Sequence, residues 1–146
     1  MTTVSKIMTR DVKSLAPSDT VSMAAKAMSE LNVGSIPVCE GGKLVGIVTD
    51  RDMVVRALAK GKDATITKLA DIMSSNVCTI KESDDMESIL EEMSQSQIRR
   101  LPVVDAAGAL VGIVSLGDIA TKSVDEEADV GESLAAISAP AQPDRA

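Results

Sequence analysis

The hydrophobic and polar positions of the chain follow one pattern that occurs twice. In the second half, Met86, Ile89, Leu90 and Met93 are spaced i, i+3, i+4 and i+7, which places them on one face of a helix. Four apolar residues repeat this spacing in the first half: Val21, Ala24, Ala25 and Met28. The pattern therefore predicts an amphipathic helix near the start of each half.

Two strands joined by a glycine-bearing turn follow each predicted helix. The expected strands are residues 36–40, 43–49, 101–105 and 109–115. A short extended segment precedes each helix, at residues 12–15 and 77–80. A second helix is expected to begin near Arg51 in the first half and near Gly117 in the second. The N-terminal caps of the first helices are expected at four residues: Ser18 or Asp19, and Ser83 or Asp84.

The two halves are copies of one sequence. Met8 and Met73 open equivalent stretches 65 residues apart, and one extra residue near Gly108 then lengthens the offset by one. With that shift, residues 44–48 and 110–114 have the identical sequence Leu-Val-Gly-Ile-Val. A match of this length after an already aligned stretch indicates an internal duplication.

The duplication predicts a fold of the α/β (α+β) class with tandem β-α-β-β-α repeats. A copy of about 50 residues struggles to cover both faces of its own sheet, so we expect the copies to pack sheet to sheet with pseudo-twofold symmetry. The expected boundaries are 1–60 for the first copy, 61–70 for a linker, 71–123 for the second copy, 124–137 for a short C-terminal helix and 138–146 for a disordered tail.

Composition narrows the classes of function. The chain has no His, Phe, Trp or Tyr, and its formal net charge is −7. It therefore lacks the usual acid–base group, the commonest metal ligand, and the basic or aromatic surfaces that bind nucleic acids. Cys39 and Cys78 form neither a CxxC pair nor a disulfide framework, and we interpret both as half-buried strand residues. We expect no enzyme, no metal site and no nucleic-acid partner.

The sequence carries no signal for a membrane or for export. No basic and then apolar leader opens it. No apolar run approaches the roughly 20 residues that span a bilayer. We expect a cytoplasmic protein with no membrane partner.

A hydroxyl and a carboxylate recur at the end of a strand in both copies, as Thr49-x-x-Asp52 and Ser115-x-x-Asp118. The hydroxyl could donate to a phosphate at the helix N-terminus, and the carboxylate could accept from two ribose hydroxyls. The same spacing is also that of a capping box, in which the two side chains bond each other's backbone N–H groups. The pattern alone leaves both interpretations open.

With these motifs the chain resembles a CBS-domain pair, also called a Bateman module, in its stand-alone two-CBS form. The resemblance reaches to about residue 120 and rests on residues 7–9, 19–21, 33–38, 43–52, 98–105 and 112–118. It implies a regulatory module that binds an adenosine derivative such as AMP, ADP, ATP, NAD or S-adenosylmethionine. AMP and ATP are the ligands we expect first, as regulatory ligands and not as catalytic cofactors.

The resemblance implies two nucleotide-binding clefts, each built from both copies. The first is expected to contain Ile47, Thr49, Arg51, Asp52, Cys78, Ile98, Arg99 and Arg100. The second is expected to contain Lys13, Val33, Gly34, Ile113, Ser115, Gly117 and Asp118. In this family the hydroxyl contacts phosphate or ribose, the aspartate holds the ribose hydroxyls, and adenine lies between aliphatic side chains such as Ile47 or Ile113.

The expected clefts differ in charge. Arg99 and Arg100 read as solvated surface residues by themselves, but beside an anion site they become phosphate partners. With Arg51 they make the first cleft the more basic one, whereas Lys13 is the one obvious cation of the second. We expect the first cleft to hold the more highly phosphorylated ligand.

The expected partners are a second copy of the chain and an unknown protein. Two amphipathic helices per copy leave an apolar face that suits a homodimer, which the resemblance also implies. Any regulatory output then acts in trans or through self-association. The alternative function is a structural dimerisation module that binds no ligand.

Overall fold

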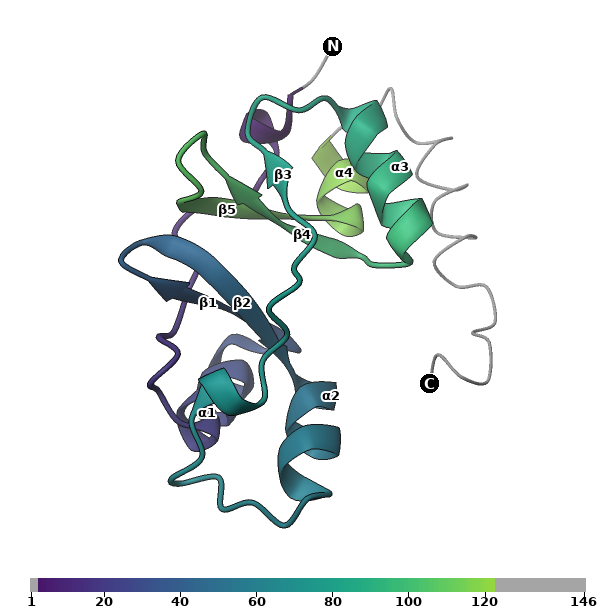
Figure 1. The fold of residues 1–146 in the computed structure, drawn as a ribbon. Coiled ribbons are helices and arrows are strands. Elements are labelled where there is room, and N and C mark those ends of the chain that lie inside the picture. Colours follow the sequence, from purple (N-terminus) through teal and green to yellow (C-terminus); the bar gives the residue numbers. More distant parts are fainter. Residues whose placement is uncertain (1–2, 123–146) are drawn as a thin grey trace. The chain divides into compact units, whose positions relative to one another are not determined.

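The computed structural model describes residues 3–122 of the chain, with the side chain of Lys122 left aside. The predicted C-terminal helix at 124–137 and tail at 138–146 lie outside the described residues. The described chain forms two compact units (Figure 1). Unit 1 takes residues 3–11, 79–106 and 111–122, and unit 2 takes residues 12–78 and 107–110.

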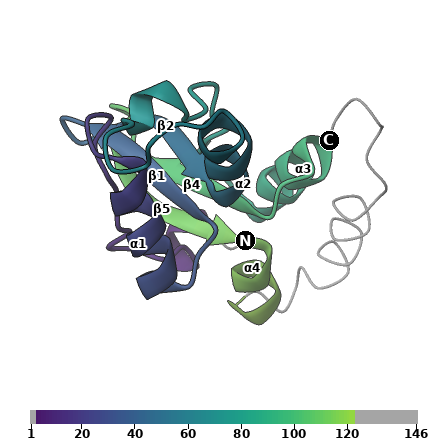
Figure 2. The ribbon, with the colours of Figure 1, turned by 90° about the horizontal axis from the view of Figure 1, so that it is seen from below.

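Unit 2 contains a two-stranded antiparallel sheet and two helical segments. Strands β1 (Ser35–Glu40) and β2 (Lys43–Thr49) pair with Ser35 opposite Thr49. Helix α1 (Val21–Leu31) precedes the sheet, and α2 (Asp50–Asp52) follows it and continues as the π-helical turn η2 (Met53–Leu58). Figure 2 shows the β1–β2 hairpin with α1 and α2 beside it. A 3-10 turn, η3 (Leu69–Asp71), completes the unit.

Unit 1 contains a three-stranded sheet in the order β3-β4-β5. Strand β3 (Ile80–Lys81) runs parallel to β4 (Arg100–Val104), which is followed by β5 (Leu110–Ser115). The helical elements of the unit are η1 (Val4–Lys6), α3 (Met86–Ser96) and α4 (Leu116–Lys122). The mixed helix and strand content and the two sheets confirm the predicted α+β class.

The amphipathic helices form largely as the spacing predicts. All four apolar residues chosen on α3 are buried, and on α1 Val21, Ala24 and Met28 are buried. Ala25 is exposed, and Ala27 is buried in its place. Each helix ends at a non-glycine residue with positive φ, Asn32 after α1 and Gln97 after α3, which is the left-handed cap geometry.

The predicted helix caps are wrong by one residue. The capping side chains belong to Thr20 and Asp85, each of which accepts a bond from the N–H three residues ahead. Asp19 and Asp84 instead accept from N–H groups three residues before them and hold the preceding turn. The next residue, Thr20 or Asp85, has the extended backbone of a cap. The Ser88 N–H lowers the pKa of the Asp85 carboxyl.

The extended segments before the helices are shorter than predicted. Residues 12–15 contribute one isolated parallel bridge, between Leu15 and Val38. Residues 77–80 contribute only the start of the two-residue strand β3. The predicted linker packs on unit 2 for part of its length, because Val21 donates to the Thr67 carbonyl at 3.0 Å and Leu69 is fully buried.

The segment that opens the first copy packs in unit 1, with the helices and hairpin of the second copy. We call residues 4–9 the first leader. Val4 and Met8 are buried in the core of unit 1, and Thr9 pairs with Ile113 on β5. A Cβ on Gly112 would lie 2.7 Å from the Met8 sulfur and 2.8 Å from the Thr9 carbonyl oxygen.

The segment that opens the second copy packs in unit 2 in the same way. We call residues 69–74 the second leader. Ile72 is buried in the core of unit 2, and Ser74 exchanges two backbone hydrogen bonds with Ile47 on β2, at 2.9 and 3.0 Å. A Cβ on Gly46 would lie 2.8 Å from the Met73 sulfur and 2.9 Å from the Ser74 carbonyl oxygen. Each leader therefore belongs to the unit that holds the other copy's hairpin and helices.

Candidate functional site

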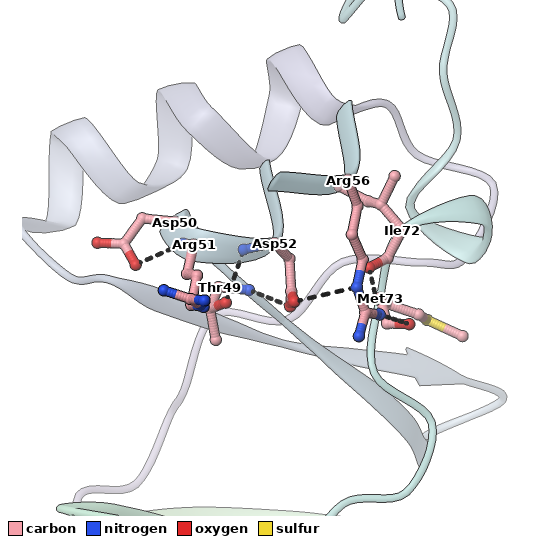
Figure 3. Close-up of polar contacts among 7 residues, drawn as sticks. All are labelled: Thr49, Asp50, Arg51, Asp52, Arg56, Ile72 and Met73. Atoms are coloured by element: carbon pink, nitrogen blue, oxygen red, sulfur yellow. Dashed lines mark hydrogen bonds and ion pairs between the residues drawn. The ribbon is translucent and has the colours of Figure 1, made fainter. Parts of the chain in front are cut away.

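The Thr49 motif, formed by Thr49 and Asp52, lies where β2 ends and α2 begins (Figure 3). The Thr49 hydroxyl oxygen accepts a bond from the Asp52 N–H at 3.0 Å. Asp52 Oδ2 accepts a bond from the Thr49 N–H, also at 3.0 Å. These reciprocal bonds make a capping box, so the capping interpretation of the sequence is confirmed.

The Ser115 motif, formed by Ser115 and Asp118, repeats this geometry in unit 1. The Ser115 hydroxyl oxygen accepts from the Asp118 N–H at 2.9 Å, and Asp118 Oδ2 accepts from the Ser115 N–H at 3.0 Å. The first residue of the helix after each strand is anchored equivalently as well. Asp50 donates to the Gly34 carbonyl at 2.9 Å, and Leu116 donates to the Arg99 carbonyl at 2.8 Å. The sequence duplication is thus also a duplication of hydrogen bonds.

The side chains of a capping box keep further capacity for hydrogen bonds. A hydroxyl that accepts one bond can still donate its own hydrogen, and a carboxylate has a second oxygen with two lone pairs. Asp52 is 8% exposed and is the one charged residue among the buried ones that the structure describes. The motif can therefore cap its helix and present a hydrogen-bond donor and an acceptor to a ligand.

Arg56 is the functional candidate that the sequence analysis missed. Its Nε lies 3.8 Å from Asp52 Oδ1, and its Nη1 donates to the carbonyls of Ile72 and Met73 at 3.2 and 3.3 Å (Figure 3). The available signal was the i, i+4 spacing of Asp52 and Arg56, which brings opposite charges together on a helix. Arg56 gives the Asp52 carboxylate a cation within its own unit.

The residues expected in the two clefts are divided between the units. Unit 2 holds Lys13, Val33, Gly34, Ile47, Thr49, Arg51, Asp52 and Cys78. Unit 1 holds Ile98, Arg99, Arg100, Ile113, Ser115, Gly117 and Asp118. In each unit the motif lies beside the start of the neighbouring strand, at Gly34 in unit 2 and at Arg99 in unit 1. The composition of either complete cleft stays a prediction, because every predicted set draws on both units.

Several of these residues are open to solvent, as a ligand site requires. The exposed ones are Lys13, Arg51, Cys78, Arg99, Arg100 and Gly117. The half-buried ones are Val33, Gly34, Ile47, Thr49, Ile98, Ile113, Ser115 and Asp118. The sequence interpretation of Cys78 as a half-buried strand residue is wrong, because Cys78 is exposed and precedes β3.

The described residues offer little for other kinds of site. Cys39 lies on β1, where burial raises the pKa of its thiol and a bond with Ser14 opposes that shift. Residues 3–122 contain no group of three Cys, Asp or Glu that could hold a metal ion. None of the helices in that range combines the length and hydrophobicity that crossing a bilayer demands.

Comparison with known proteins identifies the family. The family model described as CBS domain matches residues 4–58 and 69–125. The CBS domain-containing protein YhcV of Bacillus subtilis (strain 168) is 41% identical over 138 residues, which cover 94% of this chain and 96% of YhcV.

Two solved structures extend the likeness to proteins with bound ligands. The crystal structure of CBSX2 in complex with AMP matches with a TM-score of 0.74 at 26% identity, over 87% of this chain and 99% of that one. The CBS domain pair of protein MJ0100, in complex with 5′-methylthioadenosine and S-adenosyl-L-methionine, matches with a TM-score of 0.73 at 32% identity, over 84% and 95%. The chain therefore belongs to the CBS-domain family and carries two CBS domains.

Proposed function

We propose that the protein is a regulatory module that binds an adenine nucleotide, with AMP or ATP as the first candidates. The observation that carries the proposal is the Thr49 motif and its counterpart at Ser115, which make the same bonds in both units. The relatives crystallised with AMP, and with 5′-methylthioadenosine and S-adenosyl-L-methionine, support a nucleoside ligand.

The chemistry of the motif suits a nucleoside phosphate. The second oxygen of Asp52 accepts from the two ribose hydroxyls, and the Thr49 hydroxyl donates to a phosphate or ribose oxygen. The half-buried Ile47 supplies an aliphatic contact for adenine, and Ile113 does so at the Ser115 motif. Because these groups bind and hold a ligand without attacking it, we propose a role in regulation and not in catalysis. We also propose a cytoplasmic location for the module.

A second candidate is a structural dimerisation module that binds no ligand. The observation in its favour is the capping box itself, because capping alone explains why a hydroxyl and a carboxylate stand at these positions. The two candidates differ in one measurable property, which is direct binding of a nucleotide.

Calorimetry on nucleotide-stripped protein is the test that separates them. We expect AMP, ADP, ATP, NAD or S-adenosylmethionine to bind with a dissociation constant in the micromolar range, about −8 kcal/mol. A ligand at 100 times its dissociation constant should then stabilise the fold by about 2.7 kcal/mol in thermal unfolding. The unfolding readout needs an external dye or calorimetry, because the chain has no Trp or Tyr. Absence of heat with all five ligands would leave the dimerisation module as the better function.

Incubation with ATP tests for catalysis. We expect the protein to leave ATP unchanged, and formation of a product would argue for an enzyme.

We also propose that the protein forms a homodimer. Among the described residues the exposed large hydrophobic side chains all lie in unit 2: Met23, Leu31, Val54, Val55, Leu58 and Ile66. Leu58 is 73% exposed, and such apolar surface marks interfaces.

Light scattering at tens of micromolar should report a dimer, and Leu58→Asp should shift it toward monomer. Lys60→Asp, a nearby exposed position, is the control and should leave the dimer intact. A monomeric wild-type protein at that concentration would contradict the proposal.

A further inference from the structure

Arg56 connects the Thr49 motif to the second leader within unit 2. Its guanidinium lies between the Asp52 carboxylate on one side and the Ile72 and Met73 carbonyls on the other (Figure 3). The Arg56 side chain is 50% exposed, whereas the Asp52 side chain is 11% exposed. The buried carboxylate therefore faces a cation that is itself anchored on another segment of the chain.

The helix is irregular where Arg56 stands. Residues 53–58 form the π-helical turn η2, and the Ala59 N–H donates to the Val54 carbonyl, five residues back, at 2.8 Å. Such turns are rare in proteins overall but occur often at functional sites, where they change the direction of side chains relative to a regular helix. Here the turn carries Arg56, whose side chain contacts both the motif and the leader.

The leader that Arg56 holds is also seated on the strand that ends in the motif. Ser74 and Ile47 exchange backbone hydrogen bonds, and the Met73 sulfur lies close over Gly46. This contact leaves no room for a Cβ, and the Ser74 carbonyl oxygen that accepts from the Ile47 N–H lies equally close to Gly46, so the leader is seated tightly on β2. Arg56 thus contacts both the motif and the leader, and the leader in turn contacts the strand that ends in the motif.

We propose that Arg56 is a positioning residue that couples ligand binding at Asp52 to the second leader. The inference rests on the proposed function. When ribose hydroxyls donate to Asp52 Oδ1, they share the carboxylate charge with Arg56. The attraction between Asp52 and Arg56 weakens, and the guanidinium bonds the Ile72 and Met73 carbonyls more fully. Occupied Asp52 therefore holds the leader more tightly than empty Asp52.

Amide hydrogen exchange with adenosine as the probe tests the coupling. The reporter is the Ser74 amide in the leader, and the matched control is the Cys39 amide, which bonds the Leu15 carbonyl in the same unit. In the wild type, adenosine should slow exchange at Ser74 about threefold more than at Cys39. The comparison of two amides removes the general stabilisation that any bound ligand produces.

The variant is Arg56→Lys, which keeps a positive charge near Asp52. A single ammonium group cannot reproduce the planar fork that faces a carboxylate and two carbonyls together. We expect adenosine to slow Ser74 and Cys39 equally in this variant, with the dissociation constant changed by less than about threefold. Lys60→Ala should behave as the wild type in both measurements.

The outcomes separate this inference from the proposed function. If adenosine binds and slows Ser74 and Cys39 equally in the wild type, the coupling is overturned while ligand binding stands. If Arg56→Lys keeps the full excess protection of Ser74, the coupling does not run through Arg56 and the inference also fails. If no adenosine derivative binds the wild type, both the proposed function and the coupling are wrong.

Discussion

Asp52→Ala is expected to weaken ATP and adenosine binding at the Thr49 motif by at least about tenfold. The reason is that two ribose hydroxyls lose a charged acceptor, and each hydrogen bond to a charged group contributes roughly 1.5–3 kcal/mol. The same change removes half of the capping box, so the free energy of unfolding should also fall by about 1 kcal/mol. Calorimetric titration and thermal unfolding of the same samples measure the two effects separately.

The two measurements distinguish a ligand residue from a structural cap. If Asp52→Ala lowers stability and leaves affinity intact, Asp52 serves only the cap, and the ligand-free dimerisation module becomes the better function. Asp52→Asn is the matched variant, because it keeps an oxygen that can accept the Thr49 N–H while removing the charge. We expect it to keep most of the stability and to lose most of the adenosine affinity.

Asp118→Ala should weaken adenosine binding at the Ser115 motif, with a smaller effect on ATP. We propose that Arg51, Arg99 and Arg100 serve phosphate at the Asp52 site, where charge-assisted bonds favour the longer phosphate chain. Neutralising Arg99 and Arg100 should therefore remove most of the preference of that site for ATP over adenosine. Equal losses of ATP affinity in Asp52→Ala and Asp118→Ala, with no preference for phosphates, would contradict the proposed difference between the sites.

Gly46→Ala and Gly112→Ala are expected to destabilise the fold strongly, by about 1–3 kcal/mol each. A Cβ at Gly46 would meet the Ser74 carbonyl oxygen at 2.9 Å, and that oxygen is fixed by its bond to Ile47. At Gly112 the Thr9 carbonyl oxygen would lie at 2.8 Å. Chemical denaturation of the two variants measures the loss.

Gly117→Ala provides the matched control for these two changes. The nearest atom to a Cβ at Gly117 is the Ser115 hydroxyl oxygen at 3.6 Å, an ordinary contact distance. Because alanine favours a helix more than glycine does, this variant should unfold at the same or a slightly higher denaturant concentration. If Gly46→Ala and Gly112→Ala unfold as this control does, the leaders do not press on the strands as closely as described.

The sequence pattern predicted the repeated elements well because periodicity reports which face of an element is buried. All four apolar positions chosen on α3 are buried, and the Gly-bearing turns separate the strands where expected. The caps at Thr20 and Asp85 were displaced by one residue because two neighbouring residues at each helix start could accept the same kind of bond.

What the pattern could not predict is the partner of a buried segment. The leader residues Met8 and Met73 occupy equivalent places in the sequence, so the duplication gives no sign of which unit each contacts. Arg56 was missed for a related reason. Its partners on the second leader are 16 and 17 residues away in the chain, and only the i, i+4 contact with Asp52 is visible locally.

The exchange of leaders makes the two copies dependent on each other for folding. A chain cut between the copies would give two fragments, each carrying the opening segment that belongs on the other fragment's sheet. A single copy on its own would meet this requirement only by exchanging its opening segment with that of a second molecule. With both copies in one chain, each opening segment is covalently tied to the sheet that needs it and has a high effective concentration there.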